Sequence, residues 1–75
     1  MENTLQNILV FATNIRTVAD KQTISTVLDK NSAIQQWNID QEDVDCVLRI
    51  VSQTLSEAEI IDIIQGQDFK CATLE

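Results

Sequence analysis

Residues 55–66, LSEAEIIDIIQG, contain the clearest structural signal in this 75-residue chain. Ser56 and Glu59 have the spacing of a capping box, in which each side chain accepts a hydrogen bond from a backbone N–H in the first helical turn. Apolar residues on either side of the box have the spacing of a hydrophobic staple. Four isoleucines then give a wide apolar face, and Gly66 is placed to end the helix. The stretch therefore predicts an amphipathic helix with one buried face.

The rest of the chain divides into one further helix and four short strands. Ile24, Val27 and Leu28 recur at the i, i+3, i+4 spacing of a buried helical face, which predicts a helix over residues 18–30. The polar run 41–43 separates two β-prone stretches and predicts a hairpin turn. Apolar, β-prone stretches predict strands at residues 5–13, 34–40, 46–52 and 69–73.

The predicted elements follow the order β-α-β-β-α-β. With right-handed crossovers this order gives a ferredoxin-like α+β sandwich, a four-stranded antiparallel sheet of order 4-1-3-2 with both helices on one face. We expect residues 1–73 to form this one domain, because a chain of this length has room for a single hydrophobic core. Residues 74–75, Leu-Glu, resemble the remnant of an expression tag.

Composition and charge exclude several classes of function. The 12 acidic and 5 basic residues give a net charge of −7, so neither nucleic acid nor an anionic membrane surface is an expected partner. The sequence has no histidine and a single glycine, which argues against a catalytic triad and a phosphate-binding loop. We therefore expect no enzymatic activity and no cofactor. Two cysteines without a recognisable secretion signal favour a cytoplasmic location.

Short matches spread along the chain point to one family. They are Ile24 and Leu28 in the first helix, Ala33 and Ile34 before the second strand, and Asp68 and Phe69 before the last strand. In these positions the chain resembles the heavy-metal-associated domains of copper chaperones and metal-transporting ATPases. The resemblance covers nearly the whole chain and implies the same ferredoxin-like fold.

The metal-binding motif of that family is missing at the corresponding loop. The family has Gly-Met-x-Cys-x-x-Cys after its first strand, and counting back from Ile24 aligns Asn14 and Ile15 with its glycine and methionine. Thr17 and Asp20 fall at the two cysteines, whose soft thiolates bind Cu(I) in the family. An alcohol and a carboxylate do not replace thiolates, so we expect no tight Cu(I) binding. The sequence Thr17-Val-Ala-Asp20 instead has the form of a helix start, with Thr17 as N-cap.

The remaining metal-ligating residue types do not form a recognised site. Cys46 and Cys71 are expected in strands that another strand separates, too far apart for a disulfide, and both are expected to be buried on the helix side. Acidic residues should gather in the loops at one end of the fold. A solvated turn is the simplest interpretation, and the alternatives are a docking face for a basic partner or a weak hard-cation site. These residues are Asp20, Asp40, Glu42, Asp43, Asp45 and Asp68.

The sheet face opposite the helices is the other candidate site. By analogy with the family, Leu9 and Phe11 of the first strand are expected to face solvent beside Val47 and Val51 of the third. Such a patch would suit a protein-binding or dimer surface anchored by Phe11, and the alternative is an apolar sheet face without a role. The predicted function is non-catalytic protein interaction or regulation; the alternative is metal binding or trafficking through an atypical site.

Overall fold

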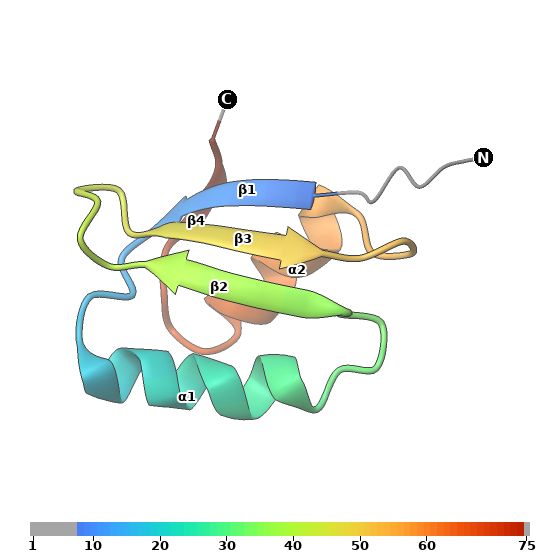
Figure 1. Ribbon diagram of the computed structural model, residues 1–75, viewed down its shortest axis with the longest axis horizontal. Coiled ribbons are helices and arrows are strands. Elements are labelled where there is room, and N and C mark those ends of the chain that lie inside the picture. The colour runs from blue at the N-terminus through green and yellow to red at the C-terminus, as the bar shows by residue number, and fades with distance from the viewer. Residues whose placement is uncertain (1–7, 75) are drawn as a thin grey trace.

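The computed structural model describes residues 8–74 and has the predicted order of elements (Figure 1). Residues 5–7, predicted to open the first strand, lie outside the described residues. The observed elements are β1 (Ile8–Thr13), α1 (Val18–Asp29), β2 (Gln36–Asp40), β3 (Val47–Val51), α2 (Glu57–Gln65) and β4 (Cys71–Thr73).

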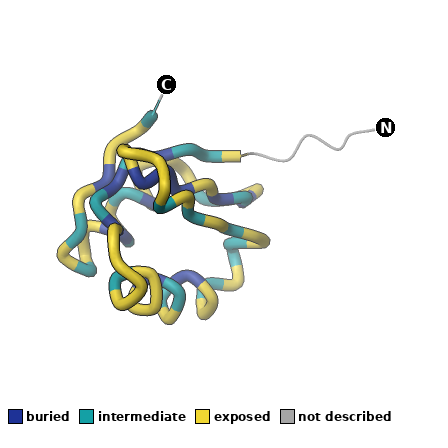
Figure 2. Tube along the Cα trace, turned by 60° about the vertical axis from the view of Figure 1, so that its left-hand side comes forward, coloured by how far each residue is buried: buried dark blue, intermediate teal, exposed yellow. Residues whose placement is uncertain are grey.

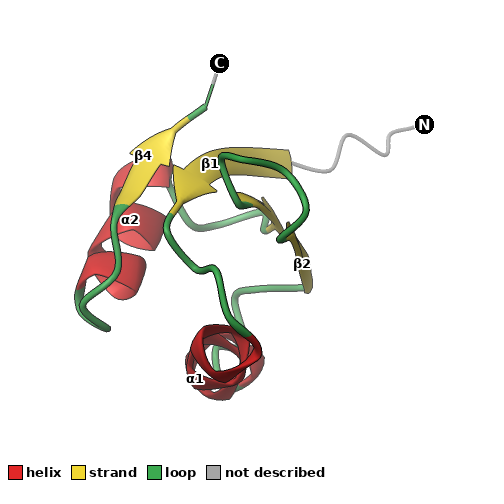
Figure 3. Ribbon diagram, turned by 90° about the vertical axis from the view of Figure 1, so that its left-hand side faces the viewer, coloured by secondary structure: helices red, strands yellow, loops and turns green. Residues whose placement is uncertain are grey.

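The four described strands form one antiparallel sheet in the order β2-β3-β1-β4, which is the predicted order read from the opposite edge. Arg49 of β3 lies opposite both Val10 of β1 and Asn38 of β2, and Ala12 of β1 lies opposite Ala72 of β4. Figure 3 shows α1 and α2 on the same side of this sheet. The predicted ferredoxin-like sandwich is confirmed.

The hydrophobic core lies between the sheet and the two helices. It takes fully buried side chains from every layer, and Figure 2 shows the buried segments in the middle of the fold, with exposed stretches on the loops and outer helix surfaces. The indole N–H of Trp37 also donates to Asp29 Oδ1 at 2.8 Å, which ties β2 to the end of α1. The central core residues are Phe11, Ile15, Ile24, Leu28, Leu48, Ile50, Ile60 and Ile64.

The predicted orientation of β1 is wrong. Phe11 is completely buried and Leu9 packs against the core, whereas Ile8 on the opposite face is 56% exposed. Residues 8–12 of β1 are apolar on both faces, so their alternation does not distinguish inside from outside. The larger side chains, Leu9 and Phe11, fill the space beneath the helices, where they remove more apolar area from water.

Both predicted helix starts and the predicted end of α2 at Gly66 are confirmed. Ser56 and Glu59 form the capping box of α2. Gly66 is the C-cap but has φ −63°, in the right-handed region, while Asp68 two residues later has φ 67°. Aspartate tolerates this left-handed conformation better than most side chains.

Candidate functional site

The loop after β1 ends in the capping box predicted from the sequence. The Thr17 hydroxyl accepts a hydrogen bond from the Asp20 N–H at 3.0 Å. Asp20 Oδ2 in turn accepts the N–H groups of Arg16 at 3.1 Å and Thr17 at 3.2 Å. These backbone donors, Arg16 first, stabilise the charged form and lower the pKa of the Asp20 carboxyl below its usual value. The two residues aligned with the family's cysteines are thus engaged in starting α1.

Further hydrogen bonds tether this loop to the rest of the fold. The Thr13 hydroxyl donates to the Cys46 carbonyl at 2.7 Å and accepts the Ile15 N–H at 3.2 Å. Gln41 Nε2 donates to the Thr17 carbonyl at 2.9 Å. The Asn14 side chain accepts the Lys70 N–H at 2.8 Å, which joins the loop to the start of β4. No local sequence pattern indicates the roles of Gln41 and Lys70, because both contact the loop from distant segments of the chain.

The side chain of Ile15 anchors the loop after β1 to the hydrophobic core. Its side chain is completely buried in the core cluster, at the position aligned with the family's methionine. Burying a side chain of this size contributes about 2 kcal/mol. The loop is therefore held by the Ile15 side chain in the core and by hydrogen bonds to neighbouring segments.

The two cysteines are buried thiols, as predicted, in different settings. Cys71 of β4 belongs to the core cluster, and burial raises the pKa of its thiol to about 11. Cys46 is buried but precedes β3, in a left-handed conformation with φ 42°, so the prediction that it opens this strand is wrong. The cause is the turn formed when the Cys46 N–H donates to the Asp43 carbonyl at 2.9 Å, which interrupts strand alternation. Both thiols are free.

The acidic residues between β2 and β3 form local turns. Asp40 Oδ1 accepts the Glu42 N–H at 3.1 Å, and Asp43 Oδ1 accepts the Asp45 N–H at 2.9 Å. Carboxylates commonly stabilise turns in this way by bonding to a backbone N–H two residues ahead. Within residues 8–74, no three histidine, cysteine or acidic side chains are grouped in a way that could hold a metal ion.

The predicted surface patch does not form as expected. Phe11 is buried, Leu9 packs against the core, and Val47 is only 4% exposed; Val51 is half-buried. The side chains that alternate with the buried residues of the strands instead make up what we call the outer face. They are Ile8, Val10 and Ala12 of β1, Gln36, Asn38 and Asp40 of β2, Val47, Arg49 and Val51 of β3, and Ala72 of β4.

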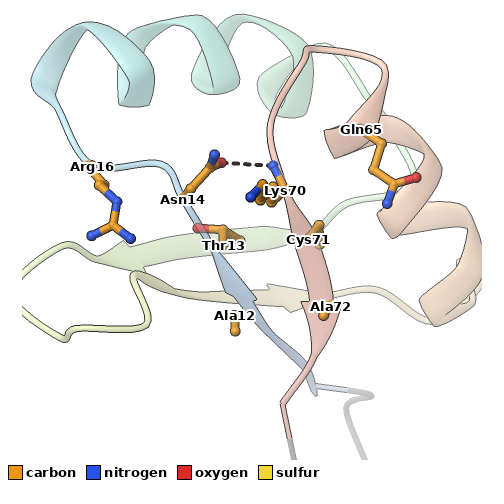
Figure 4. A pocket seen from close by; sticks show the side chains of 8 residues that line it. All are labelled: Ala12, Thr13, Asn14, Arg16, Gln65, Lys70, Cys71 and Ala72. Atoms are coloured by element: carbon orange, nitrogen blue, oxygen red, sulfur yellow. Dashed lines mark hydrogen bonds between the residues drawn. The ribbon is translucent and has the colours of Figure 1, made fainter.

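A shallow pocket of about 320 Å³ lies where β1 and β4 meet (Figure 4). Ala12 and Ala72, which are register partners on the outer face, contribute to its lining. Its polar lining includes Asn14, Arg16 and Lys70, with Gln65 from the end of α2. The hydrogen bond between Asn14 and Lys70 uses the Lys70 backbone N–H, so it does not involve the ammonium group. The pocket therefore combines small apolar side chains with two cations.

Comparison with known proteins assigns the fold and leaves the function open. The sequence matches no protein-family model and no curated protein. The structure is similar to the copper(I)-loaded first domain of the human copper chaperone for SOD1, with a TM-score of 0.79, 16% identity, and coverage of 93% of this chain and 94% of that chain. It is also similar to the apo HMA domain of a copper chaperone for superoxide dismutase, with a TM-score of 0.76, 13% identity, and coverage of 100% and 76%.

These similarities show that the chain has the fold of heavy-metal-associated domains. Identities this low carry no further conclusion about binding. Neither helix in the described part of the chain has the length and hydropathy needed to cross a bilayer.

Proposed function

We propose that this chain is a non-catalytic domain that binds another protein through its outer face. The observation that carries the proposal is the composition of this face along the two central strands. Ile8, Val10 and Val51 form an apolar run that remains partly or largely accessible, with Arg49 beside it. Neither described helix covers this side of the sheet. An apolar run with a charged residue at its edge is typical of surfaces that bind proteins.

The loop after β1 is a poor match to copper carriage, the function suggested by the names of the similar structures. Cu(I) prefers soft thiolates, and the oxygens at the aligned positions, Thr17 Oγ1 and Asp20 Oδ2, are hard donors. Both oxygens already accept backbone hydrogen bonds of the capping box. Cys71 lies in the core, where its raised pKa disfavours the thiolate. We therefore place the function on the sheet rather than on this loop.

A partner other than a second copy of the chain suits the outer face best. A twofold dimer joined through this face would bring the same surface of each copy together. With the twofold axis near Arg49, at the centre of the sheet, the two guanidinium groups would approach each other, and like charges at an interface oppose association. A different protein could place a complementary charge there instead.

Photo-crosslinking in the cells that produce the protein would test this proposal. Benzoylphenylalanine at Asn38, which is exposed on the outer face opposite Arg49, should crosslink to another protein. The same probe at Thr26, which is exposed on α1, is the matched control and should give little product.

Equal crosslinking from both positions, or none from Asn38, would contradict the proposal. A crosslinked product with the mass of two copies of this chain would show that the outer face is a dimer surface.

A further inference from the structure

We infer that the partner presents acidic side chains, and that one carboxylate enters the shallow pocket between Arg16 and Lys70. This inference rests on the proposed protein-binding role of the outer face and specifies the chemistry of its partner. It differs from the alternative raised for the acidic loops, which was a docking face for a basic partner.

The first support is the uneven distribution of charge. The chain has 12 acidic residues, yet Asp40 is the one carboxylate in the described strands. The helices and loops contain most of the others, and one of these, Asp20, lies next to the pocket because its carboxylate accepts the Arg16 N–H. Three of the five basic residues, in contrast, lie on the outer face or line the pocket where β1 and β4 meet: Arg16, Arg49 and Lys70. A local field can attract an acidic partner even when the net charge of the protein is negative.

The second support is the form of the pocket. Ala12 and Ala72 lie opposite each other and have short side chains, so they leave a depression between longer neighbours. Arg16 and Lys70 both line this depression (Figure 4). A guanidinium group binds a carboxylate through paired N–H donors, and an ammonium adds a second positive charge. The pocket is thus suited to an aspartate or glutamate side chain projecting from a protein surface.

The third support is the rigidity of the pocket's frame. The bond from the Lys70 N–H to Asn14 Oδ1 holds the start of β4 against the loop after β1. The Arg16 backbone N–H is bonded to the Asp20 carboxylate, so the backbone that carries each cation is fixed. Binding then orders mainly two side chains, which limits the entropic cost. Val10, which lies two residues before Ala12 on β1 and is paired with Arg49, connects the pocket to the rest of the outer face.

A peptide titration followed by NMR would test the inference. The probe is a capped peptide, acetyl-EELEE-amide, and the matched probe acetyl-QQLQQ-amide has nearly the same shape without charge. We expect the glutamate peptide to shift the amide signals of Asn14, Arg16, Lys70 and Ala72 saturably, and the glutamine peptide to leave them unchanged. Arg16→Gln and Lys70→Gln should each weaken binding about two- to fivefold, the range of exposed ion pairs. Lys21→Gln, an exposed charge change on α1, should have no effect.

Absence of saturable shifts with the glutamate peptide would overturn the inference, as would equal weakening by Lys21→Gln. Repeating the crosslinking from Asn38 in the double variant Arg16→Gln/Lys70→Gln separates the two proposals. Loss of the product in the variant supports an acidic partner. Undiminished product would refute the acidic partner while the protein-binding role stands, and a wild type without product would refute both.

Discussion

Thr17 and Asp20 bond to each other's backbone: the Asp20 N–H donates to the Thr17 hydroxyl at 3.0 Å, and the Thr17 N–H donates to Asp20 Oδ2 at 3.2 Å. This reciprocal pair satisfies backbone donors that the first turn of a helix leaves without partners. The sequence pattern aligns these two residues with the cysteines of the heavy-metal-associated domains, and in this structure they start α1.

The cap should contribute measurably to stability. Thr17→Ala removes the side chain that accepts the Asp20 N–H and should lower the free energy of unfolding by about 1 kcal/mol. Thr26→Ala makes the same substitution in the exposed interior of α1, where alanine is the better helix former, and should be neutral or slightly stabilising. Urea unfolding would measure both variants. Equal stability of Thr17→Ala and wild type would contradict a capping role.

Asp20 should make stability depend on pH in the acidic range. Its folded pKa lies below the ordinary value of 3.8, so the charged form is favoured by folding. Its contribution is therefore present above pH 3.8 and is lost as the pH falls through the folded pKa. Wild type should lose more stability than Asp20→Asn over this range, as measured by urea unfolding at a series of pH values. Parallel curves for the two proteins would show that the carboxylate has no such role.

Substitutions in β1 should report the orientation of the strand. Phe11→Ala removes a completely buried ring and should cost about 3–5 kcal/mol. Val10→Ala, on the outer face, should cost about 1 kcal/mol or less. Phe11→Leu provides a milder test if the alanine variant fails to fold. Chemical denaturation would measure the free energy of unfolding of these variants. A larger loss for Val10→Ala than for Phe11→Ala would contradict the observed orientation of β1 and support the one expected from the sequence.

The Cys71 thiol should be slow to react. With its pKa raised from 9.0 to about 11, it should hold about a hundredfold less thiolate at pH 8 than an ordinary thiol. Iodoacetamide labelling, mapped by mass spectrometry to separate Cys71 from Cys46, would measure the rate. Labelling in urea gives the reference rate of the unfolded chain. A labelling rate of Cys71 in the folded protein equal to that of the unfolded chain would contradict its burial.

The same raised pKa should make stability depend on pH in the alkaline range. Because the pKa of the Cys71 thiol is higher in the folded state than in the unfolded state, the free energy of unfolding should fall as the pH rises from 9.0 to about 11.

Local patterns were sufficient to predict the elements of this fold and both capping boxes. Ser56 with Glu59 and Thr17 with Asp20 are close in sequence, and their spacing alone specifies the hydrogen bonds. The order of elements then left few topologies, because crossovers have a preferred hand. This is why the strand order was correct.

The sequence did not predict the orientation of β1, because both possible orientations of this strand are compatible with the same apolar pattern. Apolar residues fill both faces of β1 from Ile8 to Ala12, so which face is buried depends on how the helices pack above it. The outer face could not be assigned correctly without that packing. The pocket depends on the pairing of Ala12 with Ala72 and on the bond from Lys70 to Asn14, contacts between opposite ends of the chain. Neither has a local sequence signal.

The most direct test of the central claim is the yield of crosslinked partner from position 38 in two variants that each add one negative charge. Val51→Glu places the charge on the outer face, and Val18→Glu places it on α1, where Val18 is 70% exposed. Circular dichroism would confirm that both variants fold. The outer-face account predicts that Val51→Glu nearly abolishes the crosslinked product while Val18→Glu leaves it at the wild-type level. A wild-type yield from folded Val51→Glu would contradict the account.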